Sequence, residues 1–252
     1  NEDGEAYQAL KQEIQNDPAV EQVHEWRDGM FTAQVDASFY SEDYWEANYD
    51  IFNAYHHGTL TKETFEEQWK QETVSANLLS VDADTFRELV KQAGIDPDGL
   101  KKNSVLVLNE GEFSTDQVSI WGMEPDRYRY YRVSPMTDLQ TGDEFSLKVY
   151  SWEKQDYVEE TLQIAGLVSA EQMSTYMQGH GDQIVWLIMG PETGEHIADL
   201  TRAEEGRPQF SPMLLISMKP GEKQLSERLR EQMEQLEQQE EPPFFFIETG
   251  YT

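Results

Sequence analysis

Cysteine is absent from the 252 residues of this chain. Its absence excludes disulfides, thiolate nucleophiles, iron–sulfur clusters and cysteine-ligated zinc. It does not indicate a compartment. A chain of this length buries enough apolar surface to fold without disulfides on either side of a membrane.

Basic residues are scarce. Lys and Arg number 19 against 49 Asp and Glu, which gives a formal net charge of −30. Such a surface repels phosphate backbones and anionic lipid headgroups, so we expect no nucleic acid partner and no direct adhesion to lipid. Aromatic residues nevertheless make up 12% of the chain, more than an acidic disordered tail contains. Composition predicts a folded, acidic, soluble domain.

Long apolar runs and targeting signals are also missing. The longest apolar run, residues 184–189 (IVWLIM), is far shorter than the roughly 20 residues that a membrane-spanning helix needs. The first residues, NEDGEAYQALKQEIQ, have neither the basic region nor the apolar core of a signal peptide. We therefore expect any membrane anchors of the protein to lie outside these residues.

Motifs of known chemistry are missing too. The chain has no P-loop and no G-x-S-x-G elbow. His24-Glu25 lacks the second histidine of H-E-x-x-H, and 179–183 (GHGDQ) precedes a predicted strand instead of following one. His56-His57 is read as a polar pair at a helix end and not as a metal site. We predict no catalytic, cofactor-binding or metal-binding residues.

One enzymatic alternative stays open, an acid-using hydrolase whose two carboxylates lie far apart in sequence. Neighbouring acids such as Asp156 with Glu159, or Glu204 with Glu205, are common in so acidic a chain and identify no pair. The segment 127–133 (RYRYYRV) carries basic and aromatic residues on both faces of a predicted strand. We interpret it as neutralising local acids, with a partner-binding strip as the alternative.

Hydrophobic periodicity predicts an α+β protein with a mixed sheet. The helices are expected at 5–15, at two places in 41–71 separated at His57-Gly58, between 84 and 94, and at 222–239. Ala6, Leu10 and Ile14 share one face of the first helix, and Thr61 is expected to cap the second helix of 41–71. The strands are expected at 74–81, 105–110, 117–121, 127–133, 144–152, 157–168, 184–189, 213–218 and 244–249, with a hairpin at 20–35 around 27–29 (RDG). Gly190 to Gly194 is expected to be a turn between two of these strands. The aromatic residues between Tyr44 and Trp69 are expected to pack in the core.

The acid-rich stretch 78–99 (LLSVDADTFRELVKQAGIDPDG) is interpreted as structural. Asp82 and Asp84 precede the helical pattern, where carboxylates cap free N–H groups, and Gly94 follows it. The aspartates of DPDG belong to a turn and do not have the register of a calcium loop. The strands before and after this helix predict a β-α-β unit with parallel neighbouring strands. We expect one domain, 1–252, or two lobes, 1–112 plus 212–252 and 113–211.

The order of these elements resembles a known family. NDPAVEQVHEW followed by a hairpin, and then SVDADTFRELVKQAGIDPDGLKKNSVLVLNE, is similar to the extracytoplasmic domain of FtsX-like (MacB-type) ABC transporter permeases of Gram-positive bacteria. The resemblance covers about the first 110 residues, and the rest only in layout. The motifs are structural, so they imply no catalytic residues. The helical segment 41–71 departs from the pattern of the family.

The resemblance implies a MacB-like fold and a non-enzymatic domain at the cell membrane. It would lie on the extracytoplasmic face between two transmembrane helices. The implied partners are a cytoplasmic ATP-binding subunit reached through those helices, a second permease copy, and a cationic peptide that the acidic charge would attract. The implied role couples ATP hydrolysis to export, sensing or partner activation. The alternatives are a free-standing surface or secreted binding protein and, third, an acid-using envelope hydrolase.

Overall fold

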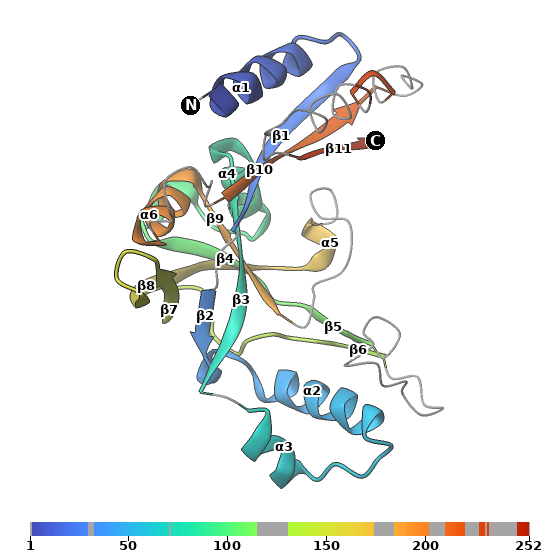
Figure 1. Ribbon diagram of the computed structural model, residues 1–252, viewed down its shortest axis with the longest axis vertical. Helices are drawn as coiled ribbons and strands as arrows, with labels where there is room; N and C mark the ends of the chain where they lie inside the picture. The colour runs from blue at the N-terminus through green and yellow to red at the C-terminus, as the bar shows by residue number, and fades with distance from the viewer. Residues whose placement is uncertain are drawn as a thin grey trace.

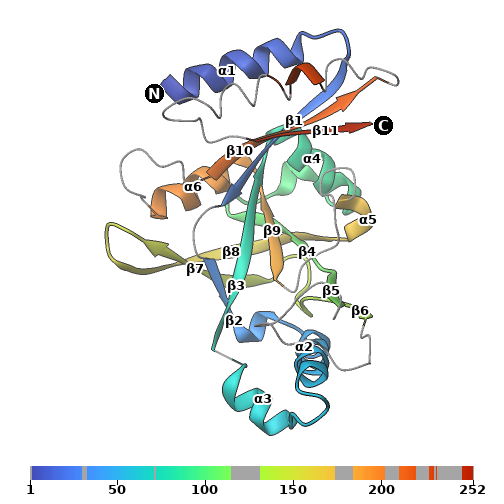
Figure 2. The ribbon, with the colours of Figure 1, turned by 45° about the vertical axis from the view of Figure 1, so that its right-hand side comes forward.

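The computed structural model describes residues 2–29, 33–70, 72–114, 131–173, 184–201, 210–219, 227–229, 231 and 246–251. It confirms an α+β protein with a mixed sheet. The molecule is elongated (Figure 1), with helix α1 (Glu2–Gln15) near one end and helices α2 (Glu42–Tyr55) and α3 (Lys62–Gln68) at the other. A second view shows the same order along the long axis (Figure 2).

Six strands between these ends close into a barrel. Around the barrel they are β2 (Ala33–Asp36), β3 (Thr73–Val81), β9 (Val185–Met189), β4 (Ser104–Leu108), β8 (Asp156–Val168) and β7 (Glu144–Ser151), which pairs again with β2. The pairs β3–β9 and β4–β8 are parallel, and the other four are antiparallel. Three of these strands come from 1–112 and three from 113–211, so the sheet does not follow the two-lobe division.

Alternating side chains fill the barrel. In β7, Phe145, Leu147 and Val149 are buried, and each is separated from the next by a more exposed residue, as expected for a strand with one solvated face. All five residues of β4 are buried, because its outer face is covered as well. Leu106 belongs to the outer cluster, which includes residues of α4 (Ala83–Gln92) and α5 (Ala170–Met173). This packing accounts for the continuous apolar run of β4.

A short helix, α6 (Pro191–Thr201), follows β9 where the sequence was expected to turn. A Cβ at Gly194 would lie 2.3 Å from Ser80 Oγ, so glycine permits close packing of this helix on β3. Gly190 and Gly194 were taken for turn residues, and that interpretation was wrong. Gly194 instead permits contact between α6 and β3, and a Cβ at Gly190 would lie 3.0 Å from the ring of Phe86 in α4.

Three further strands extend the sheet beyond the barrel. They are β1 (Val20–Gly29), β10 (Phe210–Met218) and β11 (Phe246–Tyr251), in the order β3-β1-β10-β11. The apolar face of α1 packs over β1 and β10. Leu10 and Ile14, which were predicted to share that face, join Leu214 and Ile216 in one buried cluster.

The predicted hairpin at 20–35 is not formed. β1 and β2 do not pair with each other, and both run antiparallel to β3 along one edge. Trp26 pairs with Val81 of β3, and Ala33 pairs with Ala76 further along the same strand. The two strands therefore run in the same direction, one after the other. Asp-Gly chemistry permits a reversal, but here β3 offers both segments a common pairing edge.

The predicted parallel β-α-β unit is also wrong in its pairing. β3, α4 and β4 occur in the expected order, but β9 lies between the two strands in the sheet. β9 is parallel to β3 and antiparallel to β4, so β3 and β4 run in opposite directions. A helix between two strands usually leads to a parallel neighbour in the sheet. Here α4 leads to a strand two places away around the barrel.

The helices of segment 41–71 form as predicted. Ser41 Oγ accepts a hydrogen bond from Tyr44 N, and Thr61 Oγ1 accepts one from Thr64 N, so each helix begins at a side-chain cap. Between them His57 and Gly58 adopt positive φ values of 55° and 76° and end α2. A two-stranded ribbon of β5 (Gly111–Ser114) and β6 (Tyr131–Ser134) packs against α2, with Phe113 edge-on to Tyr44.

Other expected elements have mixed outcomes. Strands were predicted correctly at 74–81, 105–110, 144–152, 157–168, 184–189, 213–218 and 244–249, within a few residues. The predicted strand 117–121 lies outside the described residues, as do 127–130 and most of the helix 222–239, of which 227–229 and 231 are helical. Among the described residues, no helix is both long and apolar enough to cross a membrane.

Candidate functional site

The acid-rich stretch 78–99 has the structural role that its sequence predicts. Asp82 Oδ1 accepts a hydrogen bond from Thr85 N at 2.9 Å and caps α4. Asp96 accepts one from Asp98 N at the turn that follows, and Gly94 has a φ of 79°. In the described part of the chain, no three His, Asp or Glu side chains are grouped closely enough to hold a metal ion.

His24 lies in a buried hydrogen-bond chain. Its Nδ1 is 2.8 Å from Thr85 Oγ1, which in turn donates to Asp82 Oδ2 at 2.8 Å. Because the hydroxyl proton points to Asp82, the threonine oxygen accepts from His24 and is not activated as a nucleophile. Burial lowers the pKa of His24, and the Asp82 carboxylate offsets only part of that effect. The chain joins β1 to the start of α4.

The other candidate residues that the structure describes are spread over separate elements. His57 ends α2, and His56 is its C-cap. His196 Nε2 is 3.3 Å from Glu160 Oε2 on the barrel surface. Asp156 and Glu159 are both exposed on β8, and Glu159 accepts a hydrogen bond from Ser146. The segments GHGDQ and Glu204-Glu205 lie outside the described residues.

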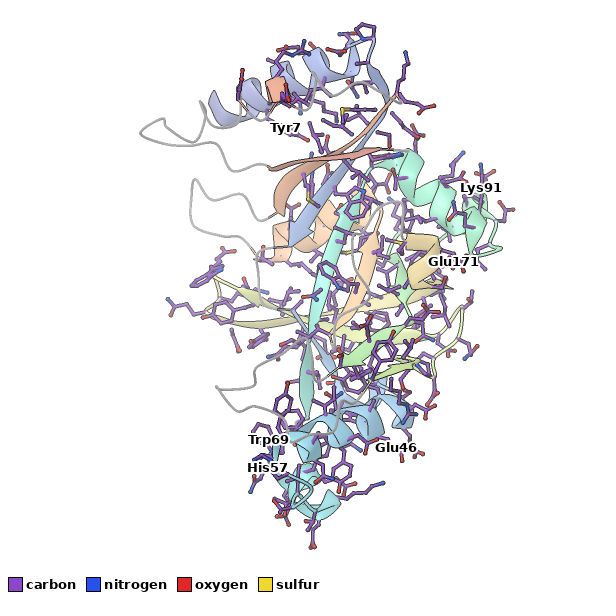
Figure 3. The ribbon with its side chains drawn as sticks, turned by 90° about the vertical axis from the view of Figure 1, so that its right-hand side faces the viewer. Tyr7, Glu46, His57, Trp69, Lys91 and Glu171 are labelled. Atoms are coloured by element: carbon purple, nitrogen blue, oxygen red, sulfur yellow. The ribbon has the colours of Figure 1, made fainter. Side chains whose placement is uncertain are left out.

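A pocket of about 330 Å³ lies between α2 and α3. We call it the α2–α3 pocket. Its lining combines aromatic rings, four acids and two lysines: Glu42, Asp43, Trp45, Glu46, Tyr49, Lys62, Phe65, Glu66 and Lys70. Figure 3 shows Glu46 and Trp69 at this end of the molecule and Tyr7 of α1 at the other. These aromatic residues were predicted to lie in the core, and no pocket was predicted at this place.

The two lysines of this pocket lie over its rings. Lys62 Nζ is 5.6 Å from the ring centre of Tyr49, and Lys70 Nζ is 5.3 Å from that of Trp45. Distances below about 6 Å give attraction between an ammonium group and the negative face of a ring. The pocket therefore holds two ammonium groups against aromatic rings, next to carboxylates.

A second pocket of about 310 Å³ shares Trp45 and Phe65 with the first. Its other aromatic lining residues are Tyr44, Phe52 and Trp69. Tyr44 stacks on Tyr40 at 3.9 Å, and burial raises the pKa of Tyr44 to about 12. Trp45 and Phe65 thus line both pockets, the acidic one and one that contains five aromatic residues and, among the described residues, no charged one. The prediction of core packing is confirmed for Tyr44, Tyr55 and Phe65, which are buried.

Arg132 of β6 forms ion pairs with two of the acids that line the α2–α3 pocket. Its guanidinium is 2.7 Å from Asp43 Oδ1 and 3.2 Å from Glu46 Oε2. These ion pairs agree with the interpretation that the basic residues of 127–133 neutralise local acids, as far as this arginine is concerned. Its strand neighbours Tyr131 and Val133 are exposed, by 62% and 51%.

An ion cluster around one buried carboxylate joins α1 to β1. The side chain of Glu25 in β1 is 10% exposed and forms ion pairs with Lys11 of α1 and with Arg27. Arg27 Nη2 is 2.8 Å from Glu25 Oε1. We call these three residues the Glu25 cluster. Burial alone would raise the pKa of Glu25, but the two basic groups outweigh it and hold that pKa below its ordinary value. Burial and the nearby Glu25 carboxylate raise the pKa of Tyr7.

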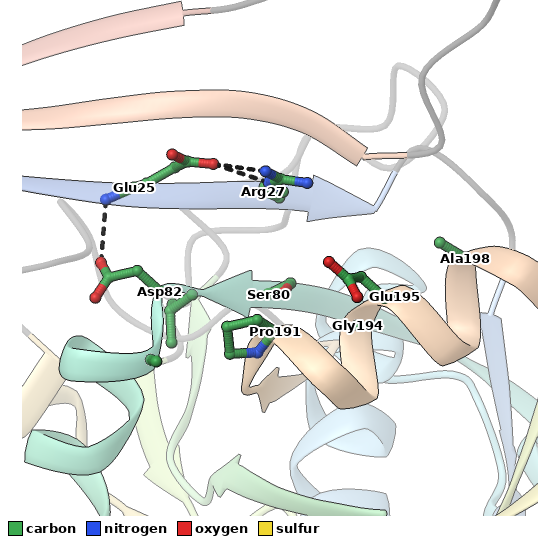
Figure 4. A pocket seen from close by; sticks show the side chains of 10 residues that line it. Glu25, Arg27, Ser80, Asp82, Pro191, Gly194, Glu195 and Ala198 are labelled. Carbon is green, nitrogen blue, oxygen red and sulfur yellow. Dashed lines mark hydrogen bonds and ion pairs between the residues drawn. The ribbon is translucent and has the colours of Figure 1, made fainter. Parts of the chain in front are cut away.

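The Glu25 cluster borders a small cavity of about 190 Å³. Figure 4 shows Glu25 and Arg27 on one wall, Asp82 and Ser80 below them, and Glu195 of α6 opposite. Glu25 N donates to Asp82 Oδ2 at 3.2 Å, which adds the cap of α4 to the same network. Since hydrogen bonds and ion pairs already occupy Glu25 and Asp82, this region fits a structural junction better than a ligand site. The sequence gives no sign of it, because Lys11 and Glu25 belong to different elements.

Comparisons with known proteins give no relative. No protein-family model matches the chain, and neither a curated protein nor a solved structure matches it.

Proposed function

We propose that this chain is the extracytoplasmic domain of an FtsX-like, MacB-type ABC transporter permease, and that it binds and does not catalyse. In this role a separate cytoplasmic subunit hydrolyses ATP, and the domain couples that cycle to export, sensing or partner activation at the outer face of the cell membrane. The motifs that carry the resemblance lie in β1, β3, α4 and β4.

One observation carries the proposal. Both ends of the chain lie near one end of the long axis, beside α1 and β11 (Figures 1 and 2). A domain inserted between two membrane helices needs its entry and exit on one side. The α2–α3 pocket lies at the opposite end, which would face away from the membrane. This arrangement separates an attachment end from a binding end.

The Glu25 cluster supports mechanical coupling of α1 to the sheet. It joins α1, the first element of the chain, to β1 of the sheet. A displacement of α1 would therefore move the sheet with it, because a buried ion pair gives way only at a high cost in free energy. The formal charge of −30 supports a cationic partner, a peptide included. A second permease copy remains among the proposed partners.

The test is to sequence the gene on both sides of the segment that encodes these residues. We expect apolar stretches of about 20 residues immediately before Asn1 and after Thr252, followed by further such stretches downstream. A signal peptide upstream with a stop codon downstream would overturn the permease proposal. That result would favour a free-standing surface or secreted binding protein.

A further inference from the structure

We propose that the α2–α3 pocket is a binding site for a ligand with two alkylammonium groups, which replace Lys62 and Lys70 on the rings of Tyr49 and Trp45. The inference names the ligand chemistry of the binding role proposed above and rests on that role. The two lysines show what the pocket accepts, because each places an alkylammonium group over an aromatic face. A ligand with the same two groups could make the same contacts.

The charges of the pocket favour a dication. Its lining has four carboxylates and two lysines, a formal charge of 2 − 4 = −2. Arg132, which pairs with Asp43 and Glu46, reduces this to −1. When the lysine side chains turn out to solvent, Glu46 loses its pair with Lys62, and the acids of the lining attract an incoming pair of ammonium groups. Among the described residues no ion pair reaches Glu42 or Glu66, so both are free to receive one.

The lysines can leave at a small cost. The side chain of Lys62 is 67% exposed, and its ion pair with Glu46 is long, at 3.8 Å. Lys70 is also exposed. Exposed pairs of this kind add little to stability, so their loss does not threaten the fold. The rings, in contrast, are fixed: Tyr49 donates a hydrogen bond to Leu60 O and packs edge-on against Phe65.

An organic cation fits this pocket better than a metal ion. No group of three acids or histidines in the described part of the chain is close enough to coordinate one. Aromatic faces attract ammonium groups and supply no ligand atoms to a metal. The second pocket, which shares Trp45 and Phe65 with the first, offers aromatic surface to any apolar part of the same ligand.

The experiment is an NMR titration of the chain, at constant ionic strength, with 1,5-diaminopentane and with pentylamine. We expect the diamine to bind more tightly, with the largest shifts on α2 and α3. A parallel titration uses an acetyl-Lys-Gly-Lys-amide peptide and its side-chain-acetylated form. Binding by the diamine alone would indicate a free polyamine as the source of the chemistry. Binding by the unacetylated peptide alone would indicate lysine side chains.

Two double variants test whether the ligand replaces the pocket lysines or is only attracted by the net negative charge of the protein. In the double variant Lys62→Gln and Lys70→Gln, the internal competitors are gone, so we expect affinity for the diamine to rise about tenfold, which corresponds to about 1.4 kcal/mol. The control is Lys101→Gln with Lys154→Gln, which removes the same charge outside the pocket lining. We expect that control to change the affinity less than twofold.

Three results would overturn the inference. They are the absence of binding by both diamine and peptide, an equal gain in the two double variants, and shifts that avoid α2 and α3. None of them affects the test of the flanking gene sequence. Conversely, a gene without membrane segments would leave a measured amine affinity intact, so the two proposals can fail separately.

Discussion

The Glu25 cluster and the α2–α3 pocket are built from the same kinds of side chain, yet they differ in burial. The Glu25 side chain is 10% exposed and receives two basic groups. In the pocket, Asp43 and Glu46 are 54% and 51% exposed, and Lys62 is 67% exposed. Burial makes a charge dependent on its partners, whereas exposure lets water replace them. The first arrangement holds two elements together, and the second permits exchange.

The largest expected effect tests this contrast directly. Glu25→Gln leaves Lys11 and Arg27 without their carboxylate, and we expect it to lower the free energy of unfolding by about 2–3 kcal/mol. The matched variant Glu46→Gln removes an exposed acid that also has two basic partners, and should cost less than about 0.5 kcal/mol. Urea denaturation measures both. If both variants lost the same free energy of unfolding, the Glu25 cluster would be no more important to stability than the exposed ion pairs of the pocket.

The helix caps extend the comparison. Asp82 caps α4 and also accepts from Glu25 N and Thr85 Oγ1, whereas Thr61 caps α3 at an exposed position. We expect Asp82→Ala to cost about 2 kcal/mol and Thr61→Ala about 0.5–1 kcal/mol. Thermal unfolding of both variants would measure the difference. A larger loss for Thr61→Ala would mean that the pocket end is the more tightly held one.

Acid should weaken the Glu25 end selectively. The pKa of Glu25 is below its ordinary value of 4.5 in the folded state. Its contribution to stability is therefore complete above pH 4.5 and is lost as the pH falls through the lower, folded-state pKa. We expect the stability difference between wild type and Glu25→Gln to shrink in acid. Asp17, whose pKa is also lowered, is present in both proteins and cancels. A difference independent of pH would argue against the ion cluster.

The smallest effect is expected at the pocket lysines. Replacing Lys62 and Lys70 by Gln should change the free energy of unfolding by less than about 1 kcal/mol in total, since exposed cation–π contacts are weak. Differential scanning calorimetry would check this value. A loss of several kcal/mol would show that the lysines hold α2 and α3 together, and that they are not placed for exchange.

Local chemistry in the sequence predicted the elements well but not their partners. Asp82 and Thr61 cap α4 and α3 as the sequence predicts, and the structure adds Ser41 as the cap of α2. The hairpin failed because a strand edge is chosen by the whole sheet: β3 pairs with both β1 and β2. Helix α6 was missed because Gly194 has a role in packing against Ser80 that composition does not reveal.

The candidate site was predictable only in its parts. The helical spacing of the aromatic residues in α2 and α3 was apparent in the sequence, but all of these residues were predicted to lie in the core. The half-buried positions of Trp45 and Tyr49, and the approach of Lys62 and Lys70 to their faces, depend on how α3 folds back onto α2. Periodicity reports which residues share a face of one helix. It does not report which side chain of another helix lies over them.

The end-to-end placement of β1 and β2 along β3 has a mechanical consequence. β1 and β2 follow one another along the same edge of β3, and β1 pairs with β10 over most of its length. A force on α1 directed along β1 would load these hydrogen bonds in shear, so that many resist together, because ladder bonds lie across the strands. In a hairpin with a tight turn at 27–29, the two strands could instead be pulled apart from their open end, so that their hydrogen bonds would break one at a time.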